Sequence, residues 1–170
     1  MILFKVIKKP YVGTWNDYEK TSSFTDGFRW NTPRTPIMYL SSNVQNAMLE
    51  IANYMPNPKM VNRLYDVAVF EFPELRLHSI EPRELPSTWN TTAHNIETQD
   101  LGMKYLSNLK DWDGIKTPSA TINEEIATNK INTIRESVYA NVAVNLLTIG
   151  IKRITLLKAY SPVYSNRMFT

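Results

Sequence analysis

Three residue types suited to chemistry on a charged sugar occur near the start of the chain. Arg29 lies in the segment Gly27–Asn31, Tyr39 follows ten residues later, and Glu50 comes eleven residues after the tyrosine. A guanidinium presents a rigid fork of donors to phosphate oxygens, and a carboxylate offsets positive charge that grows on a sugar carbon during bond cleavage. An arginine, an aromatic ring and a carboxylate from three local structures are what a site needs to hold an anionic dinucleotide and to stabilise a cation forming on its sugar.

Neighbouring residues offer further contacts to such a ligand. Gly27 has no side chain, so the backbone there can approach a ligand closely. Much later in the chain Ser119 follows Pro118, and its hydroxyl and backbone amide suit a phosphate group. The sequence has no glycine loop of the Walker or Rossmann type, so a dinucleotide is not expected to be held in either of those ways.

Each candidate, taken singly, also fits an ordinary structural role. Arg29 suits an exposed loop and Glu50 a solvated helix, Trp30 and Tyr39 suit the core, and Ser119 suits a turn. The joint order and spacing of these residues favour the site over the separate structural roles.

The composition excludes several kinds of site. The chain has 170 residues, 43% hydrophobic and 21% charged. This fits a single domain over residues 1–170 that buries roughly 70% of its unfolded surface. Cysteine is absent, which excludes a thiolate nucleophile, a disulfide framework and a cysteine zinc cluster. His78 and His94 are too far apart in the sequence for a local pair of metal ligands, so we expect no metal.

Charge and hydropathy bear on where the protein acts. The net charge of +3 is mild and the basic residues are scattered, which favours an ordinary surface over a nucleic-acid footprint. The opening segment Met1–Lys5 is too short in apolar residues for a signal peptide, and no run approaches the length of a membrane span. We therefore expect a cytoplasmic protein without membrane contact.

The segment that contains Glu50 has the pattern of an amphipathic helix. Ser41 or Ser42 is expected to cap its first turn, because a serine oxygen accepts from free amides there. The apolar residues that recur at helical spacing are Val44, Ala47, Met48, Ile51 and Met55. Glu50 lies roughly 120° from this stripe around the helix, so it faces solvent or a cleft.

Short elements between ten prolines make up the rest of the chain. Apolar residues alternate near the end as in a half-buried strand. We predict strands over 2–7, 37–40, 65–72, 138–146 and 151–157, a loop over 82–90, a helix over 101–109 and partly helical structure over 121–136. This order of elements favours an α+β fold with a mostly antiparallel sheet.

Seven blocks of the chain resemble the RES domain family, which is named for an arginine, a glutamate and a serine. The blocks are Gly27–Asn31, Ile37–Ser41, Ala47–Glu50, Leu85–Trp89, Asp100–Leu106, Pro118–Ala120 and the closing elements Asn141–Asn145 and Asn166–Arg167. Seven blocks in the family's order are much harder to obtain by chance than any single block.

The resemblance implies a fold and an activity. The fold should be like that of ADP-ribosyltransferases, a split sheet with NAD in the cleft and no cofactor beyond this substrate. Family members are toxins that cleave the bond between nicotinamide and ribose, and they pass the ADP-ribosyl group to water, phosphate or a protein. The usual partner is a helical, Xre-like antitoxin that covers the active site, and DNA is reached only through that antitoxin.

The family roles carry over to particular residues of this chain. Catalysis is assigned to Arg29, Tyr39, Glu50 and Ser119, and NAD binding to Lys5, Gly27, Arg29, Trp30, Tyr39 and Ser119. Lys5 stands where the family tends to have an arginine; lysine keeps the charge but loses the bidentate fork. Residues 121–137 also separate Ser119 from the asparagine strand by more than the family pattern suggests.

Competing functions are weighed on the same residues. An RNA-cleaving toxin needs a general base and a cationic groove, and two dispersed histidines with a charge of +3 argue against it. A binding protein without catalysis is hinted at by Lys5 alone. A toxin that modifies a protein often has a second carboxylate two residues before the catalytic one, and here that position is Met48. We therefore favour cleavage of NAD with a small acceptor, water or phosphate, over modification of a target protein.

Overall fold

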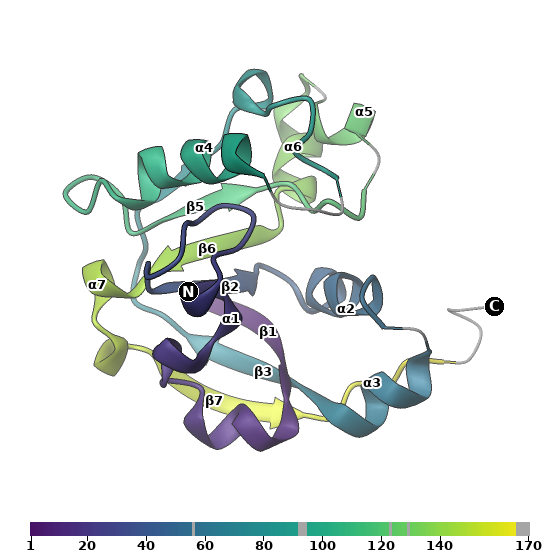
Figure 1. The fold of residues 1–170 in the computed structure, drawn as a ribbon. Coiled ribbons are helices and arrows are strands. Elements are labelled where there is room, and N and C mark those ends of the chain that lie inside the picture. Colours follow the sequence, from purple (N-terminus) through teal and green to yellow (C-terminus); the bar gives the residue numbers. More distant parts are fainter. Residues whose placement is uncertain (56, 92–94, 123, 129, 166–170) are drawn as a thin grey trace.

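A seven-stranded sheet organises the molecule (Figure 1). The computed structural model describes residues 1–165 except 56, 92–94, 123 and 129, so His94, Asn166 and Arg167 lie outside the described residues. The strand order is β4-β5-β6-β2-β1-β3-β7. The strands are β1 Ile2–Lys8, β2 Ile37–Ser41, β3 Tyr65–Glu71, β4 Leu77–Ser79, β5 Gly114–Thr117, β6 Asn141–Asn145 and β7 Thr155–Tyr160.

The sheet is split between its two central strands. β1 and β2 pair only at Phe4 opposite Ser41 among the described residues. By contrast, β1 pairs with β3 along its whole length, and β2 pairs with β6 from one end to the other. All strand pairs are antiparallel except β4 with β5. The predicted α+β class with a split, mostly antiparallel sheet is confirmed.

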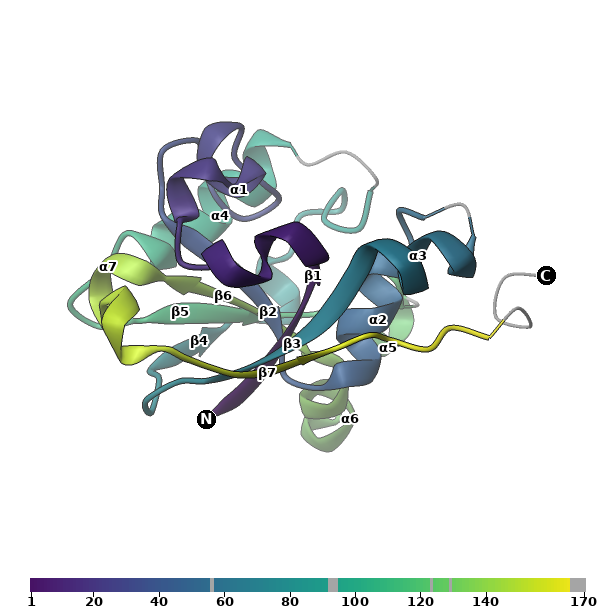
Figure 2. The same ribbon diagram turned by 90° about the horizontal axis from the view of Figure 1, so that it is seen from below.

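Helices flank the two halves of the sheet separately. In Figure 1, α4 lies beside β5 at one end of the sheet, while α2 and α3 lie toward β1 and β3. Figure 2 shows α1 and α4 on one side of the sheet and α2 and α6 toward the other. The helices are α1 Ser22–Thr25, α2 Val44–Ala52, α3 Pro58–Leu64, α4 Ile96–Leu106, α5 Glu124–Ala127, α6 Asn132–Val138 and α7 Leu146–Ile149, with 3-10 turns η1 Lys9–Thr14, η2 Tyr18–Lys20, η3 Pro82–Glu84 and η4 Ile151–Arg153. No described helix is long and apolar enough to cross a bilayer.

Three apolar clusters hold these elements together. One covers a face of the central strands around Leu3 and Phe70. A second joins α4 to the sheet around Trp30 and Trp89, which are 3% and 1% exposed. The third, around Tyr164, fixes the C-terminal segment against the region of α2 and α3. The helix that carries Glu50 is therefore packed from the sheet side and from the C-terminal side.

The prediction of a serine cap on the Glu50 helix is wrong. The N-cap of α2 is Asn43, whose side chain accepts from the Asn46 amide at 2.8 Å. Ser41 still belongs to β2, and its hydroxyl accepts from the Asn46 side chain instead. An asparagine caps as well as a serine does, and the strand continues far enough to place Asn43 at the helix start.

Several predicted boundaries shift for similar reasons. α4 starts before the predicted helix because Asn95 and Thr98 form a capping box upstream. β6 is shorter than predicted and buried on nearly all positions, since Asn145 ends it by capping α7. β7 begins after η4, so the predicted strand at 151–157 starts too early.

Candidate active site

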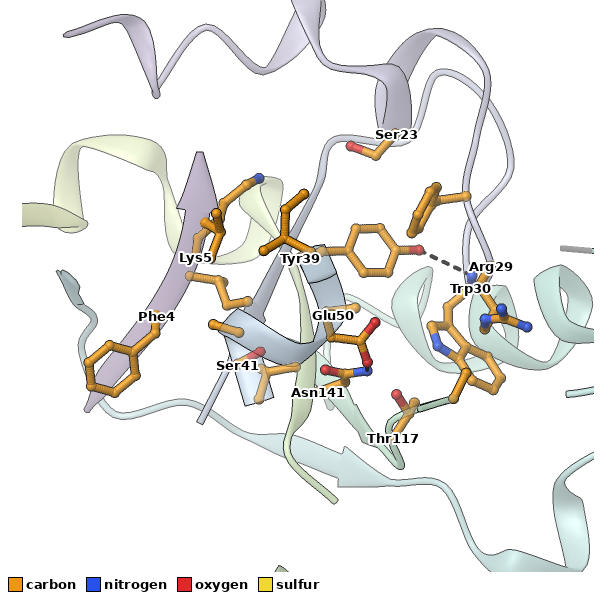
Figure 3. Close-up of a pocket in the computed structure, with 18 of the residues that line it drawn as sticks. Phe4, Lys5, Ser23, Arg29, Trp30, Tyr39, Ser41, Glu50, Thr117 and Asn141 are labelled. Atoms are coloured by element: carbon orange, nitrogen blue, oxygen red, sulfur yellow. Dashed lines mark hydrogen bonds between the residues drawn. The ribbon is translucent and has the colours of Figure 1, made fainter. Parts of the chain in front are cut away.

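The predicted residues surround a cavity of about 360 Å³ that opens where the sheet splits. Its wall comes from β1, β2, α1, α2, the turn before β2 and the adjoining ends of β5 and β6. The predicted site residues that line it are Lys5, Arg29, Trp30, Tyr39 and Glu50. In the view of Figure 3, Tyr39 and Glu50 lie between Lys5 and Arg29. The volume lies within the usual range for small-molecule sites.

The turn that presents Arg29 depends on Gly27 and Asn31. Gly27 has a φ of 77°, and a Cβ there would lie 2.8 Å from the Asn31 carbonyl oxygen. Asn31 is buried, and its amide donates to the Ser23 carbonyl at 2.8 Å. Gly27 is not part of the cavity wall; the close backbone approach that it permits is the closure of the turn on Asn31.

Helix α4 holds the same turn from outside. The Gln99 side chain donates to the carbonyl oxygens of Phe28 and Asn31, at 3.1 Å each. Gly102 lets the helix contact the turn directly, because a Cβ there would lie 2.1 Å from the Trp30 carbonyl oxygen. Gln99 could not be predicted from the sequence, since a glutamine on a mixed helix carries no local signal of a distant partner.

Arg29 is half-buried and is oriented by backbone carbonyls. Its Nη1 donates to the Trp89 carbonyl, and its Nη2 donates to the Thr91 carbonyl at 2.7 Å. A guanidinium has donors in excess of these two bonds, so N–H groups remain for an anionic ligand. The loop that contains Trp89 therefore orients the arginine at the cavity.

The hydroxyl of Tyr39 is engaged within the protein. It accepts from the Trp30 amide at 3.1 Å, the bond drawn in Figure 3, and donates to Asn31 Oδ1 at 2.7 Å. Burial raises the pKa of this hydroxyl well above its usual range, so the hydroxyl stays neutral. Phe28 packs edge-on against the ring with centroids 5.1 Å apart. Tyr39 thus offers the cavity an aromatic surface and not an acid or a base.

Glu50 is anchored through one carboxylate oxygen. Ser119 Oγ donates to Glu50 Oε1 at 2.5 Å, and Asn141 Nδ2 donates to the same oxygen at 2.7 Å. Glu50 Oε2 accepts no hydrogen bond from any residue in the described part of the chain. The carboxylate is held in place while its second oxygen stays available to a ligand.

Ser119 lies behind Glu50, outside the cavity wall. It is 1% exposed, and its hydroxyl also contacts the Thr121 hydroxyl at 2.6 Å and accepts from the Thr121 amide at 3.2 Å. In this arrangement the serine hydroxyl faces a carboxylate, which a phosphate would not approach readily. Its geometry suits the positioning of Glu50.

Lys5 supplies a cation on the β1 side of the split. The side chain is half-buried in the cavity wall and forms no hydrogen bond or ion pair with the residues that the structure describes. Burial lowers the pKa of the Lys5 amine to about 8. A half-buried amine without an anionic partner fits a negatively charged ligand.

The two asparagines of β6 serve different ends of the strand. Asn141 touches Glu50, whereas Asn145 is 2% exposed, donates to the Leu106 carbonyl at 2.9 Å and caps α7. The structure therefore brings Asn141 into the site and leaves Asn145 in a structural role. Among the described residues, no group of three or more His, Cys, Asp or Glu side chains is arranged to hold a metal ion.

Comparison with known proteins agrees with the motifs. Residues 2–143 match the RES domain. Toxin Res of Yersinia enterocolitica serotype O:8 is 25% identical over 126 residues, which cover 74% of this chain and 80% of that protein. Toxin Res of Photorhabdus laumondii is 24% identical over 126 residues, which cover 74% and 78%.

A solved structure shares the fold. A chain in the crystal structure of the M. tuberculosis MbcT–MbcA toxin–antitoxin complex superposes with a TM-score of 0.64 and 13% identity, covering 99% of this chain and 86% of that one. The region that matches the RES domain, residues 2–143, runs from β1 to the middle of β6 and includes every residue that lines the cavity. The chain belongs to the RES domain family.

Proposed function

We propose that this protein is the toxin of a toxin–antitoxin pair and that it cleaves NAD between nicotinamide and ribose. The observation that carries the proposal is the state of Glu50: one oxygen is fixed by Ser119 and Asn141, and the other is left for a ligand. Membership of the RES family and the relatives named Toxin Res support the toxin assignment.

The reaction needs one negative charge at a defined place. As the glycosidic bond breaks, its electron pair leaves with nicotinamide, and positive charge develops on the ribose carbon. A fixed carboxylate stabilises that charge, and such preorganised electrostatics often supply the largest catalytic contribution. In this proposal Glu50 Oε2 accepts from a ribose hydroxyl and faces the forming cation, while Ser119 and Asn141 keep the carboxylate from turning away.

The other cavity residues then bind the dinucleotide. Arg29 and Lys5 supply positive charge for the pyrophosphate, and the Tyr39 ring supplies a surface for nicotinamide. Because the Tyr39 hydroxyl is engaged by the backbone of Trp30 and by Asn31, it takes no part in proton transfer. Trp30 acts through the turn that carries Arg29.

The acceptor is proposed to be small. Met48, two residues before Glu50, packs in the apolar cluster of Val61, Tyr65 and Tyr164, so no carboxylate stands where one would orient a protein nucleophile. With water the products are nicotinamide, ADP-ribose and a proton; with phosphate they are nicotinamide and ADP-ribose 1″-phosphate. Modification of a target protein is the second candidate.

An antitoxin is the proposed protein partner. The solved complex that shares this fold pairs a toxin with an antitoxin. Here the mouth of the cavity includes Tyr54, which is 55% exposed, and Leu49 beside Glu50 is 47% exposed. Exposed apolar side chains next to a charged cavity suit a partner that covers the site, which we expect to be Xre-like and to carry any DNA contact.

Release of nicotinamide from NAD by the purified protein tests the function. Parallel reactions with and without phosphate, followed by chromatography, separate ADP-ribose from its 1″-phosphate. Labelled NAD added to cell extract tests the second candidate. If label enters a protein faster than free products form, the small acceptor is wrong; if no nicotinamide is released under any condition, NAD cleavage is wrong.

Expression in cells tests the physiological part. Without an antitoxin we expect growth to stop as the NAD concentration falls, and with the cognate antitoxin we expect both to recover. Arrest at an unchanged NAD concentration would point to a modified target instead.

A further inference from the structure

Asn46 lies one helical turn before Glu50 on α2, so both side chains leave the same face of the helix. The side chain of Asn141, at the start of β6, lies between them. Asn46 Nδ2 donates to Asn141 Oδ1 at 2.6 Å, and Asn141 Nδ2 donates to Glu50 Oε1 at 2.7 Å. Figure 3 shows Asn141 and Ser41 next to Glu50 at the cavity.

The two ends of an amide are not interchangeable, because one end donates and the other accepts. With its present orientation Asn141 gives a donor to the carboxylate. The reversed orientation would put its oxygen against Glu50 Oε1 and repel it. Some group must therefore select the orientation, and the donor at Asn141 Oδ1 is Asn46.

Asn46 is itself held in one orientation. It is 7% exposed, and its Nδ2 also donates to the Ser41 hydroxyl at 2.9 Å. Its backbone amide donates to the Asn43 cap, so the residue is fixed at the first turn of α2. Asn46 does not belong to the cavity wall, and it reaches the wall through Asn141 and Ser41. Of these two, Asn141 is the one that donates to Glu50.

We propose that Asn46 is a positioning residue that sets the orientation of the Asn141 amide and thereby fixes Glu50 for catalysis. The effect of Asn46 on catalysis rests on the proposed function of Glu50. Its effect on the orientation of the Asn141 amide rests on the hydrogen bonds alone and is testable without activity.

Asn46→Asp is the informative variant, because a carboxylate accepts where the amide donated. Asn141 should then turn its NH2 group toward the new carboxylate and its oxygen toward Glu50. We expect kcat for nicotinamide release to fall about 10- to 100-fold, the usual effect of losing a group that orients a functional residue, with little change in KM.

Asn43→Asp is the matched control. It makes the same change three residues away, at the N-cap of the same helix, where the side chain of Asn43 accepts from the Asn46 amide and donates to none of the residues that the structure describes. A carboxylate caps a helix at least as well as an amide does. We expect wild-type kcat and KM; equal losses in both variants would overturn the proposal in favour of a general effect of added charge.

The side-chain NH2 resonances of Asn141, assigned with Asn141→Asp, give a readout that is independent of the reaction. In the wild type and in Asn43→Asp we expect one proton shifted downfield by the Glu50 carboxylate, and in Asn46→Asp we expect that pattern to change. An unchanged pattern would overturn the orienting role even if NAD cleavage is established. If Asn46→Asp does not fold, Asn46→Ala removes the donor without adding charge and should weaken the same downfield shift.

Discussion

Glu50 and Glu84 are both held by a hydroxyl and a nitrogen donor, yet they are used in opposite ways. Glu50 Oε1 accepts from Ser119 and Asn141, both neutral, and its Oε2 has no partner among the described residues. Glu84 Oε1 accepts from the Tyr105 hydroxyl and from Lys104, and its Oε2 accepts from the Glu81 amide at 3.0 Å. Both oxygens of Glu84 accept hydrogen bonds, whereas Glu50 is anchored through one oxygen and the other remains available to a ligand.

The difference shows how the carboxylate proposed to act on a ligand is held differently from a structural one. Burial alone would raise the pKa of Glu84, but the bonds from Tyr105, Glu81 and Lys104 outweigh burial and lower the pKa to about 2. Its charge is used within the protein, because Lys104 and Tyr105 of α4 donate to this residue of η3. Glu50 is fixed by neutral donors that restrain its position without neutralising its charge, so its electrostatic effect remains for a ligand.

The largest effect is expected from Glu50→Gln. The amide oxygen can still accept from Ser119 and Asn141, so the fold and Tm should change little. Removing the charge should lower the rate of nicotinamide release about 10²- to 10³-fold. Glu84→Gln serves as the reciprocal variant and should keep a near wild-type rate; comparable losses of activity in both variants would contradict the comparison.

Glu84→Gln should instead reduce stability, by about 1–3 kcal/mol at pH 7, which for a chain of this size lowers Tm by about 2–12 °C. The pKa of Glu84 is lower in the folded state than in the unfolded chain. Its contribution is therefore present above the ordinary glutamate pKa and is lost as pH falls toward 2. The difference in unfolding free energy between wild type and variant should shrink from pH 6 downward through pH 3, as urea titrations at each pH would show. Glu19→Gln, at an exposed position, should show neither effect.

The sequence predicts Glu50 as a site residue, but it does not predict which side chains hold the Glu50 carboxylate. The sequence could predict Arg29, Tyr39 and Glu50 because their order and spacing resemble those of the RES family. The helical period also placed Glu50 away from the apolar stripe of its helix. Ser119 was also found, although its hydroxyl faces Glu50 where a phosphate contact was predicted. The predicted roles in binding and catalysis stay predictions.

The remaining parts depend on pairings between distant segments. β4 and β5 were missed because Leu77–Ser79 and Gly114–Thr117 are too short to show alternation, and they exist by pairing with each other and with β6. Asn46 looks like a solvated polar residue until β6 brings Asn141 against it. Caps such as Asn43 and Asn95 carried a usable signal, because asparagine is a strong capping residue.

The lysines near the two carboxylates extend the comparison. The hydrogen bonds that Lys104 donates to Tyr105 and Glu84 raise the pKa of its amine, whereas burial lowers the pKa of the Lys5 amine to about 8. The charge on Lys5 is therefore complete well below pH 8 and is lost as pH rises through that value. If this charge binds NAD, kcat/KM should fall several-fold between pH 7 and pH 9, since a hydrogen bond to a charged group contributes about 1.5–3 kcal/mol. Lys5→Arg should abolish this fall, because a guanidinium stays charged; the same fall in that variant would assign it to another group.

The smallest effects separate the two tyrosines that support the carboxylates. Tyr105 donates to the charged Glu84, and Tyr164 donates to the neutral Met48 carbonyl on the helix of Glu50, at 2.7 Å. Hydrogen bonds to charged groups contribute about 1.5–3 kcal/mol and neutral ones about 0.5–1.5 kcal/mol. Tyr105→Phe should therefore lower the unfolding free energy more than Tyr164→Phe, as chemical denaturation of the two variants would measure. The Met48 carbonyl sits inside α2 and keeps its place in the helix when the tyrosine hydroxyl is removed, so Tyr164→Phe should leave the rate of nicotinamide release within about twofold of wild type. If Tyr164→Phe lowers the rate of nicotinamide release by much more than twofold while the protein stays folded, the C-terminal segment positions Glu50 as directly as Ser119 does.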